Sequence, residues 1–186
     1  MSGRAIRLFA VTVLAVGSHA AEVEVAGVPN FHTVNEHLYR GGHPSHQGLE
    51  GLAKLGVKTV IDLREGDDRE GAVVEQLGMR YFRVPMAGLG APTDKQVSSV
   101  LRVFDDGASW PVFVHCKRGA DRTGTVVACY RITHDHWQNE KALDEAKIHG
   151  MSRLERAMQH YIMAFKPNLP QITDPAVAVS QNKEVQ

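Results

Sequence analysis

The chain has 186 residues and carries 21 basic and 21 acidic side chains, so its formal net charge at pH 7 is zero. This balance gives no overall attraction to nucleic acid and excludes a function that depends on general basicity. The length and the apolar fraction of 43% are typical of one globular domain with an ordinary core. Two cysteines are too few to hold a small fold together by disulfide bonds.

Residues 1–20 have the features of an export signal. Arg4 and Arg7 form a basic start, residues 8–16 are an apolar run, and residues 18–20 (Ser-His-Ala) offer a small-x-small cleavage site. The apolar run is shorter than the roughly 20 residues that span a bilayer. We therefore expect a cleaved signal peptide, an exported protein that is periplasmic or secreted, and no stable membrane insertion after cleavage. An uncleaved anchor is the alternative.

Apolar periodicity and turn residues divide the rest of the chain into alternating strands and helices. The predicted strands follow an extended lead-in over residues 21–34 and cover residues 37–40, 57–63, 80–84 and 112–114. The predicted helices cover residues 45–55, 67–77, 93–104, 125–136, 139–149 and 152–165. This alternation predicts an α/β fold with a mainly parallel central sheet of about four to five strands, flanked by helices. We expect the domain to span residues 21–166, with a disordered polar tail over residues 167–186.

The most informative stretch covers residues 112–124, which predict a short strand, a tight loop and a helix. Cys116 opens the loop, and Arg122 follows six positions later. Backbone N–H groups in a loop that leads into a helix point at a common centre and, with the helix dipole, bind an anion such as phosphate. The same positive field favours a thiolate on Cys116. The planar guanidinium of Arg122 can bind two phosphate oxygens at once.

This layout predicts a phosphate site that needs no metal and no cofactor, with Cys116 as the nucleophile. Gly119 permits a backbone turn that a side chain would obstruct. The other cysteine, Cys129, is expected to be a core residue of the following helix. The residues expected to bind phosphate are Lys117, Arg118, Gly119, Ala120, Asp121 and Arg122.

Two parts of the chain resemble a known family. The pattern His-Cys-x-x-Gly-x-x-Arg-Thr-Gly over residues 115–124 is similar to the signature loop of cysteine-dependent protein tyrosine phosphatases, in the dual-specificity branch. Residues 38–44, followed by a predicted helix and a strand that ends at residues 62–64, resemble bacterial and plant–fungal atypical dual-specificity phosphatases. The resemblance implies a dual-specificity-phosphatase-like fold and a phosphocysteine intermediate.

The resemblance also implies roles for individual residues. The Thr123 hydroxyl would donate a hydrogen bond to the Cys116 sulfur and ease breakdown of the phosphocysteine. His115 would hold the loop through hydrogen bonds and would not act as a base. Arg40 would be largely structural. Ordinary packing in the loop is the alternative for Thr123 and His115.

The general acid is the uncertain part of the predicted site. The family's acid is an aspartate that precedes the cysteine by roughly 25 to 35 residues, and it protonates the leaving oxygen, which is worth about 10²–10⁴-fold in rate. That window carries glycines at residues 88 and 90, and Asp94 is the only carboxylate nearby. Asp94 is a candidate acid or a residue at a helix start.

Asp121, inside the loop, is the second candidate. It is a candidate acid as in myotubularin-type loops, or a residue that caps the helix and orients Arg122. A substrate with a good leaving group, such as a phosphoanhydride, would need no acid.

The main hypothesis is a phosphomonoester hydrolase that acts on phosphorylated protein or a small phosphorylated substrate, most simply a protein tyrosine or dual-specificity phosphatase. A phosphoinositide or inositol polyphosphate phosphatase is an alternative, because Lys117 and Arg118 make the loop basic, although they are equally interpreted as solvated rim charges. A phosphate-binding pseudophosphatase is another, because the acid is in doubt. A sulfur- or arsenate-handling protein fits the Arg-Thr-Gly ending less well.

Overall fold

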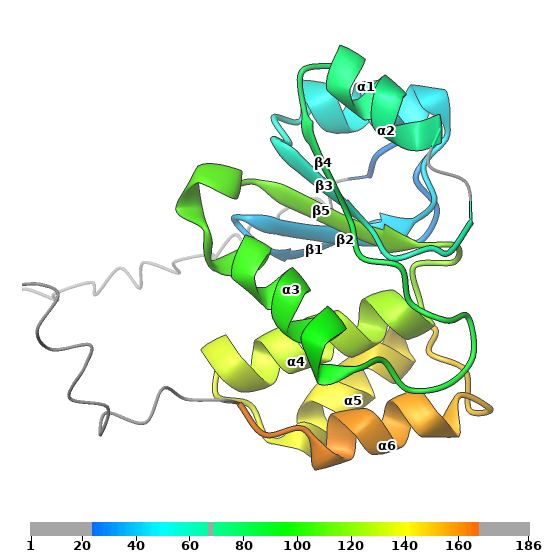
Figure 1. The fold of residues 1–186 in the computed structure, drawn as a ribbon, viewed down its shortest axis with the longest axis vertical. Helices are drawn as coiled ribbons and strands as arrows, with labels where there is room; N and C mark the ends of the chain where they lie inside the picture. The colour runs from blue at the N-terminus through cyan, green and yellow to red at the C-terminus, as the bar shows by residue number, and fades with distance from the viewer. Residues whose placement is uncertain (1–23, 67–68, 168–186) are drawn as a thin grey trace, which may run out of the picture.

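The computed structural model of the protein describes residues 24–66 and 69–167 (Figure 1). The predicted signal peptide over residues 1–20 lies outside these ranges, as do residues 168–186 of the predicted tail. Export and the disordered tail therefore stay predictions. None of the helices in the described residues has the length and apolarity that a membrane span requires.

A five-stranded sheet forms the centre of the fold and confirms the predicted α/β class. Its strand order is β1-β2-β5-β3-β4, with β1 antiparallel to β2 and every other neighbouring pair parallel. The strands are β1 (His32–Asn35), β2 (Leu38–Gly42), β3 (Thr59–Asp62), β4 (Arg80–Arg83) and β5 (Val112–Cys116). All five residues of β5 are buried, as expected for a central parallel strand with both faces covered.

Helices cover both faces of this sheet. The α-helices are α1 (His46–Lys54), α2 (Arg69–Gln76), α3 (Asp94–Asp105), α4 (Asp121–His134), α5 (Asn139–Ile148) and α6 (Arg156–Ala164), and η1 (Gly107–Ser109) is a short 3-10 turn. Helices α1 and α2 lie on one face, and α3, α4, α5 and α6 lie on the other (Figure 1). Every predicted helix and strand has a counterpart, and Ser45 caps α1 as predicted, because its side chain accepts a hydrogen bond from the Gly48 N–H.

The prediction missed one strand and placed the start of α6 too early. The lead-in contains β1, which has one apolar residue and no fully buried position, so neither periodicity nor hydrophobicity marks it as a strand. Helix α6 begins at Arg156 and not at Ser152. Ser152 instead donates its N–H to Asp121 and accepts a hydrogen bond from the Leu154 N–H through its hydroxyl, so this segment is bound as a turn before the helix starts.

The end of β2 also differs from the prediction. The predicted strand ends at residue 40, but Gly41 and Gly42 continue it and pair with His115 and Cys116. A Cβ at Gly41 would lie 2.9 Å from the Phe113 ring, and one at Gly42 would lie 3.1 Å from the Arg118 carbonyl carbon. Glycine is therefore used here for close approach to β5 and to the loop that follows it.

The alternation of side chains along β5 separates two functional residues. Val112, Val114 and Cys116 belong to the apolar cluster on the α3 and α4 side, whereas Phe113 belongs to the cluster under α1 and α2. The His115 ring stacks on the Phe113 ring at 5.5 Å between centroids. The nucleophile candidate and the histidine before it consequently face opposite sides of the sheet.

Candidate active site

The loop between β5 and α4 forms the centre of the site. Cys116 ends β5, is 2% exposed and is not in a disulfide. Helix α4 begins at Asp121, five residues after Cys116, and its N-cap residue, Ala120, makes no capping hydrogen bond through its side chain. The first N–H groups of a helix have no partner within the helix, so an uncapped helix start next to a thiol is suited to hold an anion there.

Gly119 gives the loop its shape. Its φ of +73° lies in the left-handed region, and a Cβ on it would lie 2.3 Å from the Gly41 carbonyl carbon and 2.5 Å from the Gly42 nitrogen. Its carbonyl accepts hydrogen bonds from Asn30 Nδ2 at 3.1 Å and from Arg40 Nη2 at 2.9 Å. The loop is thus pressed against β2 and held there by two side chains.

Arg40 places a cation behind the loop. Its side chain comes from β2 and is 1% exposed. Burial lowers the pKa of Arg40 to about 10, while the electrostatic interactions with Glu145 and Cys116 act in the opposite direction. A positive charge near a thiol favours the thiolate. The resemblance assigned Arg40 a structural role, and the structure adds an electrostatic interaction with the nucleophile candidate.

Arg122 is held from the other side of the loop. Its Nη1 donates to the carbonyl oxygens of Leu63 at 3.3 Å and Met86 at 3.2 Å. Within residues 24–66 and 69–167, its Nε and Nη2 make no hydrogen bond. The guanidinium is therefore oriented through one nitrogen while two N–H-bearing nitrogens stay available for phosphate oxygens.

Asp121 is engaged through both carboxylate oxygens. Oδ1 accepts from the Ser152 N–H at 2.8 Å, and Oδ2 accepts from Arg118 Nη2 at 2.5 Å. Its side chain does not cap α4 and makes no hydrogen bond to Arg122. Asp121 thus ties the signature loop to the segment before α6.

Asp94 lies in another part of the fold. Thr93 is the N-cap of α3, and Asp94 is the first residue of that helix. Its Oδ1 accepts a hydrogen bond from the Tyr161 hydroxyl at 2.8 Å, at the edge of a cavity of about 660 Å³ between α3 and α6. The nearest thiol that its charge affects is Cys129, a buried residue of α4 as predicted, whose pKa is raised chiefly by burial. Cys129 lies about 12 Å along α4 from the first residue of that helix, so the structure groups Asp94 with Tyr161 and not with Cys116.

The segment where the family's acid was expected carries none. Residues 86–92 read Met-Ala-Gly-Leu-Gly-Ala-Pro, and Leu89 is 77% exposed. The Met86 carbonyl holds Arg122, so this loop does border the site. It therefore offers the leaving group apolar and backbone atoms but no carboxylate.

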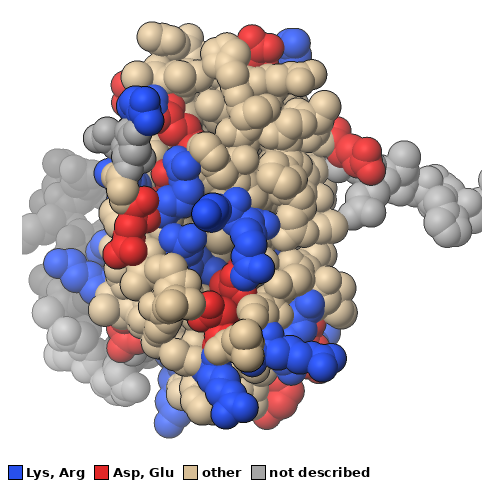
Figure 2. Space-filling model, turned by 90° about the vertical axis from the view of Figure 1, so that its right-hand side faces the viewer, with Lys and Arg blue, Asp and Glu red and all other residues tan. Residues whose placement is uncertain are grey.

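The remaining predicted residues line the loop as expected from their positions. Thr123 is fully buried, and its hydroxyl has no hydrogen-bond partner within the described ranges. Gly119 and Ala120 are buried, whereas Lys117 and Arg118 are exposed. Figure 2 shows the face that carries the carboxyl ends of the parallel strands, where Lys and Arg side chains gather in a central patch.

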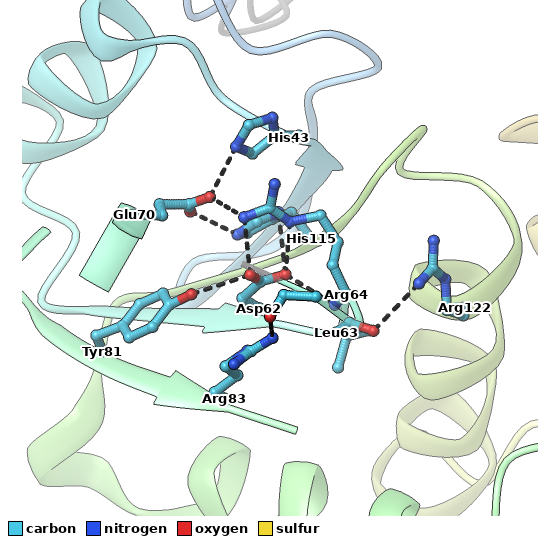
Figure 3. Close-up of polar contacts among 10 residues, drawn as sticks. His43, Asp62, Leu63, Arg64, Glu70, Tyr81, Arg83, His115 and Arg122 are labelled. Carbon is cyan, nitrogen blue, oxygen red and sulfur yellow. Dashed lines mark hydrogen bonds and ion pairs between the residues drawn. The ribbon is translucent and has the colours of Figure 1, made fainter. Parts of the chain in front are cut away.

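Sequence reasoning missed a buried polar network beside the loop (Figure 3). Asp62 and His115 are fully buried, and Glu70 is 9% exposed. His43 is half exposed, and its Nε2 lies 2.9 Å from Glu70 Oε2. Burial lowers the pKa of His43, and the charge of Arg64 adds to this effect. A charged residue at the end of an otherwise apolar strand, as at Asp62, is the signal that could have indicated the network.

The network holds three residue types that also bind metals. One ligand atom from each of Asp62, Glu70 and His115 can be chosen so that all lie within 4.8 Å of one another. However, Arg64 donates to both carboxylates. Burial alone would raise the pKa of Asp62, but the hydrogen bonds from Arg64 and the charge of His115 outweigh burial and leave the pKa lowered. The guanidinium is thus the cation that neutralises these carboxylates.

Comparisons with known proteins agree with this geometry. The family model described as "DSP-PTPase phosphatase fused to NAD+ Kinase" matches residues 23–163. The dual specificity protein phosphatase TpbA of Pseudomonas aeruginosa is 34% identical over 143 residues, which cover 71% of this chain and 64% of TpbA, so the chain spans slightly less than two thirds of that relative. The inositol diphosphatase DSP5 of Arabidopsis thaliana is 31% identical, with 70% of this chain and 67% of DSP5 covered.

Solved structures give the same result for the fold. The crystal structure of P. aeruginosa TpbA superposes with a TM-score of 0.64 at 32% identity, and covers 74% of this chain and 86% of that one. The catalytic core of the PP-IP phosphatase Siw14 from S. cerevisiae superposes with a TM-score of 0.69 at 23% identity, and covers 86% and 96%. At that identity the second likeness concerns the fold alone.

Gly119→Ala is expected to abolish phosphate binding and to lower the free energy of unfolding by about 3 kcal/mol or more, because the new methyl group meets backbone atoms that cannot move aside. The matched control is Gly56→Ala, since Gly56 has a φ of +90° and open space around its Cβ position. It carries the left-handed strain alone, about 1 kcal/mol, and should bind phosphate normally. Urea unfolding and calorimetric titration with phosphate measure both effects. Equal losses in the two variants would contradict the close-approach argument.

Proposed function

Because the chain belongs to the cysteine-dependent protein tyrosine phosphatase superfamily, in its dual-specificity-like branch, we propose that it is a phosphomonoester hydrolase that works through a phosphocysteine intermediate. The observation that carries the proposal is the position of Cys116 at the start of an uncapped α4, with Arg122 held over the loop by two backbone carbonyls. Nucleophile, anion cradle and charge clamp are all supplied by one strand–loop–helix unit.

The first chemical step transfers the phosphoryl group to sulfur. The Cys116 thiolate attacks phosphorus, a P–S bond forms, and the P–O bond to the leaving group breaks with its electron pair on the departing oxygen. The loop N–H groups and Arg122 bind the equatorial oxygens, where charge is spread in the transition state. The departing oxygen takes a proton from a donor or from water.

The second step releases phosphate. Water attacks phosphorus, loses a proton, and displaces the Cys116 sulfur as a thiolate. The Thr123 hydroxyl, buried and without another partner in the described part of the chain, donates a hydrogen bond to that sulfur and stabilises it as it leaves. Arg40 and the helix dipole favour the same charge.

Phosphorylated protein is the substrate class that we propose first. TpbA, a dual specificity protein phosphatase, is 34% identical to this chain, and a cysteine-to-serine variant of TpbA has been solved in complex with pTyr. A phenol is a better leaving group than an aliphatic alcohol, and neither sequence candidate for the general acid is free: Asp121 accepts two hydrogen bonds and Asp94 is bonded to Tyr161. Both facts favour phosphotyrosine over phosphoserine.

Inositol diphosphates are the second candidate. The exposed Lys117 and Arg118 add positive charge at the mouth, and the loop over residues 86–92 has no carboxylate. A phosphoanhydride leaves as a phosphate oxygen and needs little protonation, and a polyanionic ring gains from a basic rim. DSP5, named as an inositol diphosphatase, is 31% identical to this chain.

Replacing Cys116 by serine tests the mechanism. Cys116→Ser is expected to lose hydrolysis of an aryl phosphate completely, because a serine hydroxyl is not ionised by this field, while it still binds phosphate. Cys129→Ser, which alters the buried thiol of α4, is the control and should retain activity if it folds. The wild type should be inhibited by vanadate. Full activity in Cys116→Ser would rule out the phosphocysteine route.

A series of aryl phosphates with different leaving groups tests the general acid. If neither aspartate donates the proton, Asp121→Asn slows all members alike, by about tenfold through the loosened loop, and Asp94→Asn changes none. Rates are compared as the slope of log kcat/KM against the leaving-group pKa. A slope that becomes steeper in one variant only would identify that aspartate as the acid.

Substrate class is tested with a phosphotyrosine peptide and an inositol diphosphate in one assay. We expect the peptide to have the higher kcat/KM for the wild type. Lys117→Ala should lower kcat/KM for the inositol diphosphate more than for the peptide, because the rim charge acts on extra phosphate groups. A higher kcat/KM for the inositol diphosphate would favour the second candidate.

A further inference from the structure

Glu70 is a buried carboxylate with three positively charged or proton-bearing neighbours from three parts of the chain (Figure 3). Its side chain is 5% exposed and stands in the first turn of α2. Oε2 accepts from Arg64 Nη2 at 2.5 Å and lies 2.9 Å from His43 Nε2, while Oε1 lies 2.8 Å from His115 Nε2. Glu70 therefore joins the ends of β2, β3 and β5 at one point.

Arg64 also binds Asp62, and these hydrogen bonds close the turn over residues 62–64. Its Nε and Nη2 donate to the two oxygens of Asp62 at 2.9 and 2.8 Å, and its own backbone N–H donates to Asp62 Oδ1 at 2.8 Å. The Tyr81 hydroxyl donates to Asp62 Oδ2 at 2.9 Å. Charged and bidentate hydrogen bonds of this kind are short and strongly directional. The two residues on either side of Leu63 are thus bound to each other.

The Leu63 peptide connects this turn to the phosphate clamp. Its N–H donates to the His115 carbonyl at 2.9 Å, and its carbonyl accepts from Arg122 Nη1 at 3.3 Å. Figure 3 shows the order of contacts from Glu70 through Arg64 and Asp62 to Leu63 and Arg122. Any movement of the turn moves one of the two carbonyls that orient Arg122.

We propose that Glu70 is a positioning residue for Arg122: with Arg64 and Asp62, it fixes the Leu63 carbonyl so that the guanidinium faces the phosphate loop. This inference rests on the proposed phosphatase function. Glu70 belongs to α2, on the face of the sheet opposite to the α3 and α4 cluster that contains Cys116, so its proposed action runs through Arg122.

The energetic character of the network supports a positioning role. Buried ion pairs add little net stability, because desolvation offsets their attraction, but removing one partner is strongly unfavourable. Such groups hold one geometry and reject others. In catalysis a misplacement of about 1 Å can cost about 100-fold in rate. A network that fixes one carbonyl is therefore expected to affect the reaction rate more than the free energy of folding.

A double-mutant cycle tests the proposal. Glu70→Gln retains the side-chain volume but leaves Arg64 without one of its two carboxylate partners. We expect kcat for an activated aryl phosphate to fall about tenfold and the vanadate dissociation constant to rise about tenfold. In an Arg122→Ala background the same change should alter either quantity by less than about twofold, because the group through which it acts is gone. Glu50→Gln is the matched control, since Glu50 faces His46 on the exposed side of α1 at 3.5 Å, and it should change nothing.

One outcome would overturn the role of Glu70, and another would overturn the proposed function. Equal losses in the wild-type and Arg122→Ala backgrounds overturn the proposal, because a merely structural role is additive. If Glu70→Gln does not fold, Arg64→Lys takes its place in the cycle, since lysine keeps the charge but cannot form the fork. A wild type that binds vanadate but hydrolyses no phosphomonoester contradicts the proposed function, and vanadate affinities alone then complete the cycle for Glu70.

Discussion

The site depends on one close approach, the crossing of Gly119 over Gly41 and Gly42. Because Gly119 has no side chain, the loop after Cys116 can approach β2 until the Gly119 carbonyl reaches Arg40 and Asn30. This approach fixes the backbone of the loop between the thiol and α4. The shape of the loop is therefore a consequence of backbone packing against β2, where Gly42 leaves room for the loop backbone at Arg118 and Gly41 leaves room for the Phe113 ring.

Charge is distributed around the cradle in two layers. Arg40 lies behind the loop, desolvated, while Lys117 and Arg118 lie at its exposed rim. The inner charge acts on the nucleophile at all ionic strengths, because a buried charge is little screened, whereas the rim charges act on incoming phosphates and weaken with salt. Asp121 binds both Arg118 and Ser152 and so secures the loop.

For the proposed phosphatase function, these features define the nucleophile and the clamp more strongly than the group that protonates the leaving oxygen. The loop over residues 86–92 contributes the Met86 carbonyl to Arg122 and exposes an apolar side chain, Leu89, to whatever binds. Under the proposed function, this asymmetry favours leaving groups that depart as weakly basic oxygens. A tyrosyl phosphate and a phosphoanhydride share that property, so both proposed substrate classes are compatible with the site.

The sequence by itself determined the local parts of this protein. The strand, loop and helix over residues 112–124 are contiguous, so the sequence could place Cys116, Gly119 and Arg122 around one loop, and periodicity located every helix and all strands except β1 within the described residues. Tertiary structure decided which side chains meet. Asp121 and Ser152 are 31 residues apart, and Asp94 and Tyr161 are 67 apart; such pairs leave no pattern along the chain. The same holds for Glu70, whose partners come from three strand ends, because only the parallel sheet brings those ends to one edge.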